Sequence, residues 1–250
     1  MRGKTVEVRA CTSLEEFDRC VELQRQVWGF ADIELVPKDV IVVAASTGGQ
    51  VFGAFEGREM VGFVLAFPGY RNARPYLHSH MLAVRPESRD HGVGRRLKLK
   101  QREDALARGL ELVEWTFDPL ELKNAYFNLE RLGVIVRRYV PNKYGRTSSP
   151  LHGGLATDRL VAEWWLKTGR VEAAVAGRSP APGSTCQRIA VPADIAEIKQ
   201  RDRAAAGKVQ AEARRQFEQW FSQGYAVTGF VREERQGIYL LEPLREELAR

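Results

Sequence analysis

The stretch Leu77–Leu97, which reads LHSHMLAVRPESRDHGVGRRL, decides how this chain folds. Its apolar residues alternate as in a β-strand up to Val84-Arg85-Pro86, and a short turn then leads through Arg89–Gly94 into a basic helix. A glycine-containing loop at a helix N-terminus favours anions, because the loop amides and the helix dipole both point at the ligand. Further positive charge comes from three arginines: Arg89, Arg95 and Arg96. The stretch therefore predicts a site for a phosphorylated cofactor.

Three known motifs can be compared with this glycine loop. A P-loop ends in Gly-Lys-Ser/Thr, but Gly94 is followed by two arginines. A dinucleotide-binding fingerprint needs a third glycine where this chain has Leu97. Arg89–Gly94 instead fits the pattern R/Q-x-x-G-x-G/A after a strand ending in Val-x-Pro, and it resembles the pyrophosphate-binding motif of the GNAT N-acyltransferase superfamily. A plain helix start with a glycine turn is the structural alternative.

The charge of the chain agrees with an anionic ligand. Its 250 residues contain 38 Lys and Arg against 32 Asp and Glu, which gives a net charge of +6. Much of the excess lies between Arg71 and Arg108, around the glycine loop, and this favours a phosphorylated cofactor over nucleic acid. No run of basic residues interleaved with aromatic ones indicates a nucleic-acid surface. Length and composition are those of a globular protein with one large domain or two small ones.

Cysteine usage and the first residues favour a cytoplasmic protein. Cys11, Cys20 and Cys186 are scattered without a C-x-x-C spacing, so neither a disulfide framework nor a zinc site is indicated. The opening residues, MRGKTVEVRA, contain no apolar signal segment. The longest apolar run, Val40–Ala45, is too short to cross a bilayer. We therefore expect a cytoplasmic protein without a membrane partner and without a resident metal.

Periodicity and turn residues predict an α+β fold. Ser13 and Glu16 form a capping box for a helix that ends at Trp28-Gly29. Further helices are expected over 37–45, 92–108 and 120–132, and strands over 6–11, 50–55, 60–67, 76–84, 111–117, 134–140 and 158–166. This order predicts a mixed, mostly antiparallel central sheet flanked by helices. Over residues 6–168 it is similar to the order of elements in the GNAT superfamily.

Three segments are expected along the chain. An acyltransferase domain would occupy residues 1–168 and a linker residues 169–186, because GRSPAPGST at 177–185 is rich in Pro, Gly and Ser. Residues 187–250 would form a smaller α/β extension with a strand over 187–191, one long helix up to Ser222, and a hairpin over 225–231 and 237–241. The strings LHSHMLAV, TFDP, NAYFNLERLG and LHGGLATDRL together resemble a group of longer GNAT proteins, some of which acylate amino acids, including by succinyl transfer.

His78 and His80 are the leading candidates for acid–base chemistry. They lie two residues apart on one strand and are expected to project from the same face. A neutral imidazole can take a proton from an amine near working pH, directly or through water. The string H-x-H-x-L-A-V resembles GNAT members in which two histidines are linked to amine deprotonation, and there His80 would lie nearer the thioester. A hydrogen-bonded histidine of the sheet is the structural alternative.

Two carboxylates of the next strand are further candidates. The resemblance implies that the sheet opens between this strand and the histidine strand, so that Asp118 would face the cleft and hold the substrate ammonium or act as base. Capping of the helix that follows Pro119-Leu120 explains Asp118 equally well. Glu114 is a second candidate base. The histidine pair has no clear third ligand for a metal ion.

The resemblance also implies where coenzyme A (CoA) binds. The backbone of the strand end would hold the pantetheine arm and polarise the thioester carbonyl, and the expected contacts are Leu82, Ala83, Val84, Arg89, His91, Gly92, Val93, Gly94, Arg95, Arg96, Asn124, Tyr126 and Asn128. Many GNAT enzymes place a tyrosine four residues before the glycine that ends the later helix, to protonate the leaving thiolate. This chain has Leu129 there, with Tyr126 one turn earlier and Tyr139 and Tyr144 beyond the helix. The acid is therefore unassigned, and water or unaided departure of the thiolate would serve instead.

A basic stretch after that helix suits the carboxylate of an acceptor. It consists of Arg137, Arg138, Lys143 and Arg146. A solvated basic face is the alternative. Trp28 and Phe30 lie in the region where GNAT enzymes close over acceptors, and packing in the core is their default interpretation.

These features predict an N-acyltransferase that moves an acetyl or succinyl group from acetyl-CoA or succinyl-CoA to a primary amine. The amine would attack directly in a ternary complex. A small-molecule acceptor such as an amino acid is the leading hypothesis, and a homodimer is left open. Two alternatives from other classes are a GNAT-fold CoA-binding or regulatory protein without turnover, and a nucleic-acid-binding protein that uses its basic surface.

Overall fold

The computed structural model describes residues 6–145, 153–178 and 186–244. The chain forms two compact units. The described part of unit 1 is residues 6–113, and that of unit 2 is residues 114–145, 153–178 and 186–244. The boundary falls inside strand β5 (Leu112–Phe117), well before the change of composition at Gly169.

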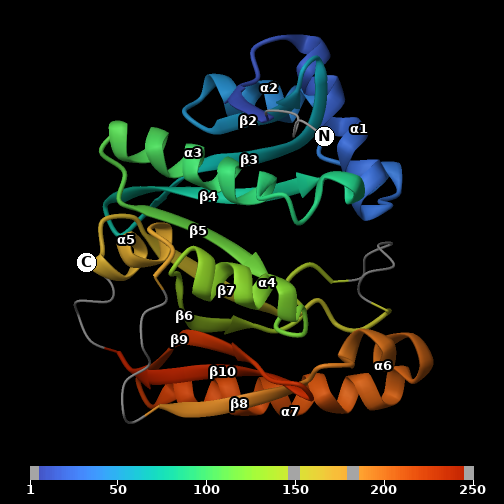
Figure 1. Ribbon diagram of the computed structural model, residues 1–250, viewed down its shortest axis with the longest axis vertical. Helices are drawn as coiled ribbons and strands as arrows, with labels where there is room; N and C mark the ends of the chain where they lie inside the picture. The colour runs from blue at the N-terminus through green and yellow to red at the C-terminus, as the bar shows by residue number, and fades with distance from the viewer. Residues whose placement is uncertain (1–5, 146–152, 179–185, 245–250) are drawn as a thin grey trace. The chain divides into compact units, whose positions relative to one another are not determined.

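Unit 1 contains an antiparallel sheet with helices on both faces (Figure 1). The strand order β1-β2-β3-β4 follows the chain, with the bounds β1 (Val6–Ala10), β2 (Gln50–Glu56), β3 (Glu59–Arg71) and β4 (Arg74–Val84). Helices α1 (Leu14–Trp28) and α2 (Lys38–Ser46) cover one face, and α3 (Val93–Ala107) covers the other. Short 3-10 turns are η1 (Asp32–Glu34) and η2 (Pro86–Ser88). The layers confirm the mixed, mostly antiparallel architecture expected from the sequence.

Local signals explain how α1 is placed against the sheet. The Ser13 hydroxyl accepts from the Glu16 amide, and the Glu16 carboxylate accepts from the Ser13 amide, so the expected capping box is present. The helix ends at Gly29, which adopts a left-handed φ of 61°. The inner face of α1 packs with α2 and the sheet in one apolar core. This core includes Phe17, Cys20, Leu23, Ile41, Phe63 and Leu65.

Unit 2 is built on a second run of strands in the order β5-β7-β6-β9-β10-β8. Their bounds are β6 (Ile135–Val140), β7 (Arg159–Trp165), β8 (Gln187–Pro192), β9 (Tyr225–Arg232) and β10 (Gln236–Pro243). The helices are α4 (Leu122–Tyr126), which continues as the π-helical turn η3 (Phe127–Arg131), then α5 (Gly169–Val175), α6 (Ile195–Arg201) and α7 (Arg203–Ser222). Figure 1 shows α7 running along the strands of the C-terminal hairpin.

The C-terminal segment is part of the core of unit 2. Strand β9 pairs with β6 through Val136 and Val227. Phe217 of α7 is fully buried and stacks on Tyr139 of β6 at a ring-centroid distance of 5.8 Å. Since the extension supplies both sheet pairing and buried aromatic area, it stabilises the strands that precede it.

Two expectations about local structure need correction. The long helix expected up to Ser222 is interrupted at Asp202, whose backbone is extended (φ −148°, ψ 89°) and whose carboxylate accepts from the Ala205 amide to cap α7. Residues 169–175 of the expected linker form helix α5, which Thr168 caps by accepting from the Val171 amide. The remainder of the Pro/Gly/Ser-rich string from 179 to 185 lies outside the described residues.

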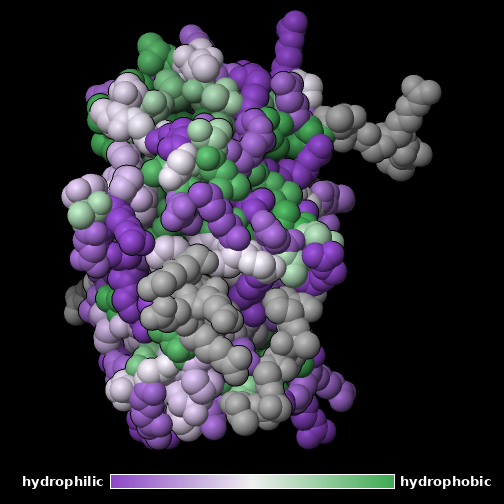
Figure 2. All heavy atoms as spheres, turned by 90° about the vertical axis from the view of Figure 1, so that its left-hand side faces the viewer, coloured by the Kyte–Doolittle hydropathy of each residue, from purple (hydrophilic) through white to green (hydrophobic). Residues whose placement is uncertain are grey.

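Within the described ranges, no helix is long and apolar enough to cross a membrane. On the face drawn in Figure 2, hydrophilic residues are interspersed with hydrophobic ones. The most exposed large apolar side chains of unit 1 are Ile33 in η1, at 94%, and Tyr70 in β3, at 74%.

Candidate active site

The glycine loop connects the end of β4 to α3 and is held against the strand. The Arg89 guanidinium Nε donates to the Val84 carbonyl oxygen over 3.1 Å. Asp90 and Gly92 have left-handed φ values of 61° and 77°. A side chain at Gly92 would meet no neighbour but would be strained at this φ, which explains the glycine at this position.

The N-terminus of α3 is suited to an external anion. Gly92 provides no capping side chain, and the first turn of this 15-residue helix contains no acidic residue. Its amides therefore carry the positive end of the helix dipole without a carboxylate nearby on the helix. His91 and Arg96 are exposed and Arg95 is half-buried.

The strand end lies against this helix start. Val93 is buried and packs in one apolar cluster with Leu82 and Val84, whereas Ala83 is buried in the core under α1 and α2. A Cβ at Gly94 would lie 3.7 Å from Val84 Cγ2, which shows how closely the helix start approaches the strand. Unit 1 therefore brings together the two predicted sets of CoA contacts, 82–84 and 89–96.

Strand β4 has a β-bulge at His80. Ala66 pairs with Ser79 and Leu65 pairs with Met81, so that His80 is the extra residue. Bulges re-aim side chains and are frequent beside active sites. Neither the bulge nor its position was predicted from the sequence.

The two histidines form one aromatic cluster with Phe67. Their ring centroids lie 6.1 Å apart, and His80 meets Phe67 edge-on at 5.4 Å. Phe67 pairs with His78 across the strands and packs on the core under α1 and α2. The expected shared face is confirmed, and it is the face that carries α1 and α2. His78 is half-buried and His80 is exposed.

A buried lysine lies on the opposite face of the same strand. Lys98 of α3 is 2% exposed, and its Nζ donates to Ser79 Oγ over 3.0 Å and to Gln101 Oε1 over 2.6 Å. Burial lowers the pKa of the Lys98 ammonium well below its ordinary value. The sequence missed this residue, because a lysine in a basic helix gives no local signal that it is buried.

In unit 2, Asp118 is a buried ion-paired residue. Its Oδ2 accepts from Lys199 Nζ of α6 over 3.3 Å, and its Oδ1 accepts from the Leu120 amide over 2.8 Å. The same lysine donates to Glu121 Oε1 over 3.0 Å. Asp118 thus closes the turn before α4 and has a countercharge from the C-terminal extension, whereas the N-cap residue of α4 is Glu121, so the expected helix capping by Asp118 is not found.

The charges of the basic stretch are largely matched within unit 2. Arg137 and Arg138 contact Glu163, and the Arg138 Nη2 also donates to Glu114 Oε1 over 2.6 Å. Glu114 and Glu163 are 3% and 1% exposed, so these arginines neutralise buried carboxylates. Lys143 is exposed over the Tyr144 ring, at 5.6 Å from its centroid. Arg146 lies outside the described residues.

The later helix presents its predicted polar residues in different ways. Asn128 is buried and accepts from the Trp115 indole Nε1 over 3.3 Å, whereas Asn124 and Tyr126 are exposed. The π-helical turn begins directly after Tyr126, and Leu129 within it is fully buried. Such turns change the register of side chains and are frequent at functional sites.

Neither of two further tyrosines, Tyr139 and Tyr144, is an evident acid for the thiolate. Tyr139 donates to Asp158 Oδ2 over 2.5 Å, and burial together with this carboxylate raises its pKa, so it is a poor proton donor. Tyr144 is 47% exposed, and its hydroxyl lies 2.9 Å from Thr116 Oγ1.

The rings of Trp28 and Phe30 in unit 1 stack with their centroids 5.6 Å apart, and Trp28 is partly buried against the core.

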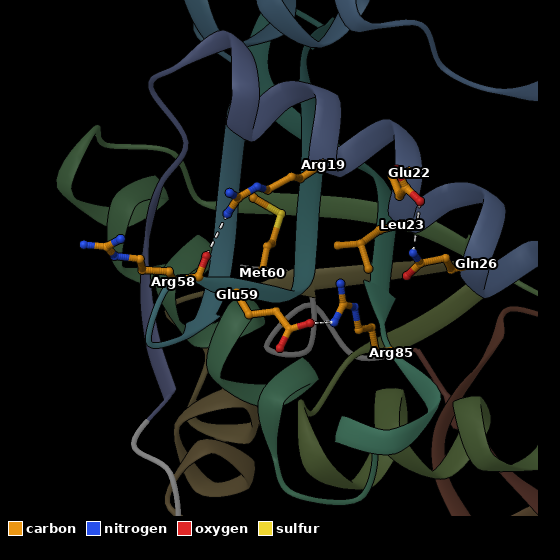
Figure 3. A pocket seen from close by; sticks show the side chains of 8 residues that line it. All are labelled: Arg19, Glu22, Leu23, Gln26, Arg58, Glu59, Met60 and Arg85. Atoms are coloured by element: carbon orange, nitrogen blue, oxygen red, sulfur yellow. Dashed lines mark hydrogen bonds and ion pairs between the residues drawn. The ribbon is translucent and has the colours of Figure 1, made fainter.

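A hollow of about 400 Å³ lies beside α1, and its lining includes Arg85, which directly follows the strand end at Val84 (Figure 3). Its polar groups largely satisfy one another: Arg85 pairs with Glu59, Arg19 donates to the Arg58 carbonyl oxygen, and Gln26 donates to Glu22. Leu23 and Met60 are its apolar lining. Among the described residues, no group of three or more His, Cys, Asp or Glu side chains is placed to hold a metal ion.

Comparison with known proteins assigns the family of the matched segment. Residues 15–133 match the acetyltransferase (GNAT) family. This segment runs from α1 through the histidine strand and the glycine loop to the end of η3. Over these residues the chain is similar to the acetyltransferases of the GNAT family. No curated protein gives a significant match to the chain.

Solved structures show the same fold at low identity. The ribosomal-protein-S18-alanine N-acetyltransferase from Escherichia coli aligns with a TM-score of 0.52 and 12% identity, over 66% of this chain and 96% of that chain. FeeM, an N-acyl amino acid synthase from uncultured soil microbes, gives 0.50 and 11%, over 65% and 91%. Arabidopsis thaliana Naa50, in complex with a bisubstrate analogue of CoA, gives 0.50 and 12%, over 63% and 97%. At these identities the similarity establishes the fold alone.

Proposed function

We propose that this protein is an acyl-CoA-dependent N-acyltransferase that transfers an acetyl or succinyl group to the amine of a small molecule, with an amino acid as the leading acceptor. One observation carries the proposal: in unit 1 an uncapped helix N-terminus with a basic first turn adjoins a bulged strand that bears two contacting histidines. The first is suited to a pyrophosphate and the second to proton transfer.

Cofactor binding would use the glycine loop and the strand end. The amides at the start of α3, with Arg95 and Arg96, would hold the pyrophosphate. Backbone amides of Leu82–Val84 would hold the pantetheine arm and polarise the thioester carbonyl. Arg89 contributes through the loop, because its guanidinium is anchored on the Val84 carbonyl.

The reaction would proceed by direct attack. His80, with His78 beside it, removes a proton from the acceptor ammonium directly or through water. The free amine attacks the thioester carbonyl, and the tetrahedral oxyanion is stabilised by the strand amides. The adduct nitrogen loses its remaining extra proton to water, and the carbon–sulfur bond then breaks to give the amide. The CoA thiolate leaves without an assigned protein acid, since a thiol is far more acidic than an alkyl amine. We assign no part in this sequence to Asp118, whose charge is matched by Lys199.

Within unit 2, the described residues of the basic stretch differ in how well they suit the carboxylate of an acceptor. Arg137 and Arg138 are paired with buried carboxylates, so they are poor candidates for a substrate clamp. Among the described residues of this stretch, Lys143 is exposed and is best suited to a substrate carboxylate.

Release of CoA thiol tests the proposal. The purified protein is incubated with acetyl-CoA or succinyl-CoA and a panel of amino acids, polyamines, aminoglycosides and peptides, and acylated products are identified by mass. We expect turnover with at least one amino acid. His80→Ala should lower kcat by about 100-fold, the usual contribution of a general base. Tyr70→Ala, an exposed change on the neighbouring strand, should leave kcat unchanged.

The alternatives give different results in the same experiment. CoA binding without turnover of any amine would overturn the enzyme proposal and favour a non-catalytic CoA-binding protein. Binding of random duplex DNA that weakens with salt and that CoA does not displace would favour the nucleic-acid alternative. An unchanged rate in His80→Ala would remove this histidine from the mechanism.

A further inference from the structure

Lys98 is a buried lysine, so its ammonium group is not available to bind the phosphates of a cofactor. Only 2% of it is exposed, and lysine is rarely buried to this extent. It follows Leu97, which is fully buried in the apolar cluster between α3 and the sheet. An apolar residue of similar length would fill the same space, and replacement of a buried charge by a well-packed apolar side chain is often neutral or stabilising. Stability alone therefore does not explain a lysine here.

The hydrogen bonds of Lys98 join α3 to β4, and its partner Gln101 in turn bonds to β2 through its backbone carbonyl. The Lys98 Nζ donates to Ser79 Oγ on β4 and to Gln101 Oε1 one turn further along α3. The Gln101 carbonyl oxygen accepts from Gln50 Nε2 of β2 over 3.0 Å, and the same amide group donates to Asp104 Oδ2 over 2.7 Å. The lysine thus belongs to a connected network of hydrogen bonds between helix and sheet, and such networks fix geometry more than they add stability.

This network lies between the two parts of the candidate site in unit 1, the histidine pair on β4 and the start of α3. Ser79 lies between His78 and His80 and is the last paired residue before the bulge. Its side chain points to the α3 face, whereas the histidines lie with Phe67 on the other face. Lys98 itself lies one helical turn after Gly94, at the helix start that is suited to the CoA pyrophosphate.

We infer that Lys98 is a positioning residue for acyl transfer: through Ser79 it holds β4 in the bulged form that presents His80, and through α3 it links that form to the helix that binds CoA. The inference rests on the proposed function. Lys98 itself touches neither substrate in this role. Loss of its amine leaves the cofactor site intact and relaxes the orientation of the histidine.

The full-length variant Lys98→Met tests the inference. Methionine keeps the length and apolar volume of the side chain and removes the two hydrogen bonds. We expect a melting temperature equal to or above that of the parent protein, a kcat lowered by about tenfold or more, and a KM for acyl-CoA within about twofold. Ser79→Ala removes one of the same bonds from the other side and should change kcat in the same direction.

Lys100→Met is the matched control. Lys100 lies on the same helix and pairs with Glu103 over 3.1 Å, with 34% of its side chain exposed. The same chemical change there should leave kcat unchanged. If Lys98→Met and Ser79→Ala both keep the parental kcat, Lys98 only fills the core and the inference is overturned. If Lys98→Met does not fold, Ser79→Ala decides.

A spectroscopic measurement keeps the inference testable should the protein show no turnover. In protein labelled with ¹⁵N-histidine, the imidazole signals of His78 and His80 should shift in Lys98→Met at fixed pH, whereas that of His91, exposed on the glycine loop, should stay in place. Unchanged signals for His78 and His80 would overturn the positioning role. Absence of turnover in the parent protein would refute the proposed function without deciding this point.

Discussion

Single residues of unit 2 have partners that their neighbours in sequence do not reveal. Asp118 is paired with Lys199, which lies 81 residues away, and Glu114 with Arg138, which lies 24 residues away. A local role of Asp118 before the helix could be predicted, but its side chain bonds the Leu120 amide in the preceding turn and does not cap α4. The countercharge could not be predicted, because it depends on which distant elements the fold brings together, here helix α6. For the same reason the sequence overestimated the charge that Arg137 and Arg138 can offer to a substrate.

The buried amine of Lys98 gives the free energy of unfolding a pH dependence of defined sign. Because burial lowers its pKa in the folded protein, the unfolded chain binds more protons at this group between the folded pKa and the ordinary value of about 10.4. The free energy of unfolding should therefore rise with pH across this window. Lys98→Met has no group to titrate at this position. At the lower end of this pH window it should therefore have a higher free energy of unfolding than the parent protein.

Urea unfolding of both proteins between about pH 7 and about pH 10 checks this expectation. The difference in the free energy of unfolding between Lys98→Met and the parent should narrow as the pH rises. A difference that stays constant over the range would show that the lysine is protonated in the folded protein.

The elements of unit 1 follow local signals closely. Helix α3 was expected over 92–108 and forms over Val93–Ala107, and the capping box at Ser13 is present. These signals lie within one turn of the boundary that they set, so they can be seen in one sequence. The bulge at His80 and the π-helical turn after Tyr126 were missed, because both are departures from a regular register. The histidine pair was thus predicted, whereas the backbone that presents it was not.

At the start of α3, one substitution should affect the stability of the protein and its affinity for CoA in different ways. Arg96→Glu places a carboxylate in a first turn that has none, on an exposed side chain. The helix dipole favours this carboxylate, so the melting temperature should stay equal or rise slightly. Affinity for CoA should fall by about tenfold or more, because a charge beside the phosphates is reversed.

Calorimetric titration with CoA measures the affinity, and thermal unfolding measures the stability. Arg102→Glu makes the same change of charge six residues further along the helix, so it should weaken CoA binding much less. Equal losses in the two variants would indicate that the helix start does not hold the phosphates.

On the scale of the molecule, the C-terminal extension is a structural part of unit 2. Arg214 of α7 contacts both oxygens of Asp158, over 2.7 Å and 2.8 Å, and Asp158 is fully buried before β7. The sequence predicted the strands and hairpin of this segment. Its weak echo of the preceding helix-strand-strand order did not reveal that β9 pairs directly with β6.

Arg214→Ala should destabilise the protein because it leaves a buried carboxylate without its countercharge. We expect a loss of about 2–3 kcal/mol in the free energy of unfolding, below the range for a fully buried pair. The expected loss is below that range because 34% of the Arg214 side chain is exposed, so that water weakens the ion pair. Arg215→Ala, the next residue on the same helix, breaks an exposed pair with Glu212 and should change little. Denaturant unfolding compares the two, and equal stability would show that the extension is not coupled to β7.

The pairing of β6 with β9 also decides where the sheet of unit 2 ends. Without β9, strand β6 would expose a row of unpaired backbone amides and carbonyls. Such an edge can pair with a strand of another molecule, and this pairing often begins aggregation. The last strand of the order is β8 instead, only six residues long and closed by Pro192, which has no amide hydrogen to donate. Its outer position also bears Arg188, paired with Glu233. Among the described residues, the sheet of unit 2 thus ends on a short, charged and proline-terminated strand, which is a poor template for edge-to-edge pairing.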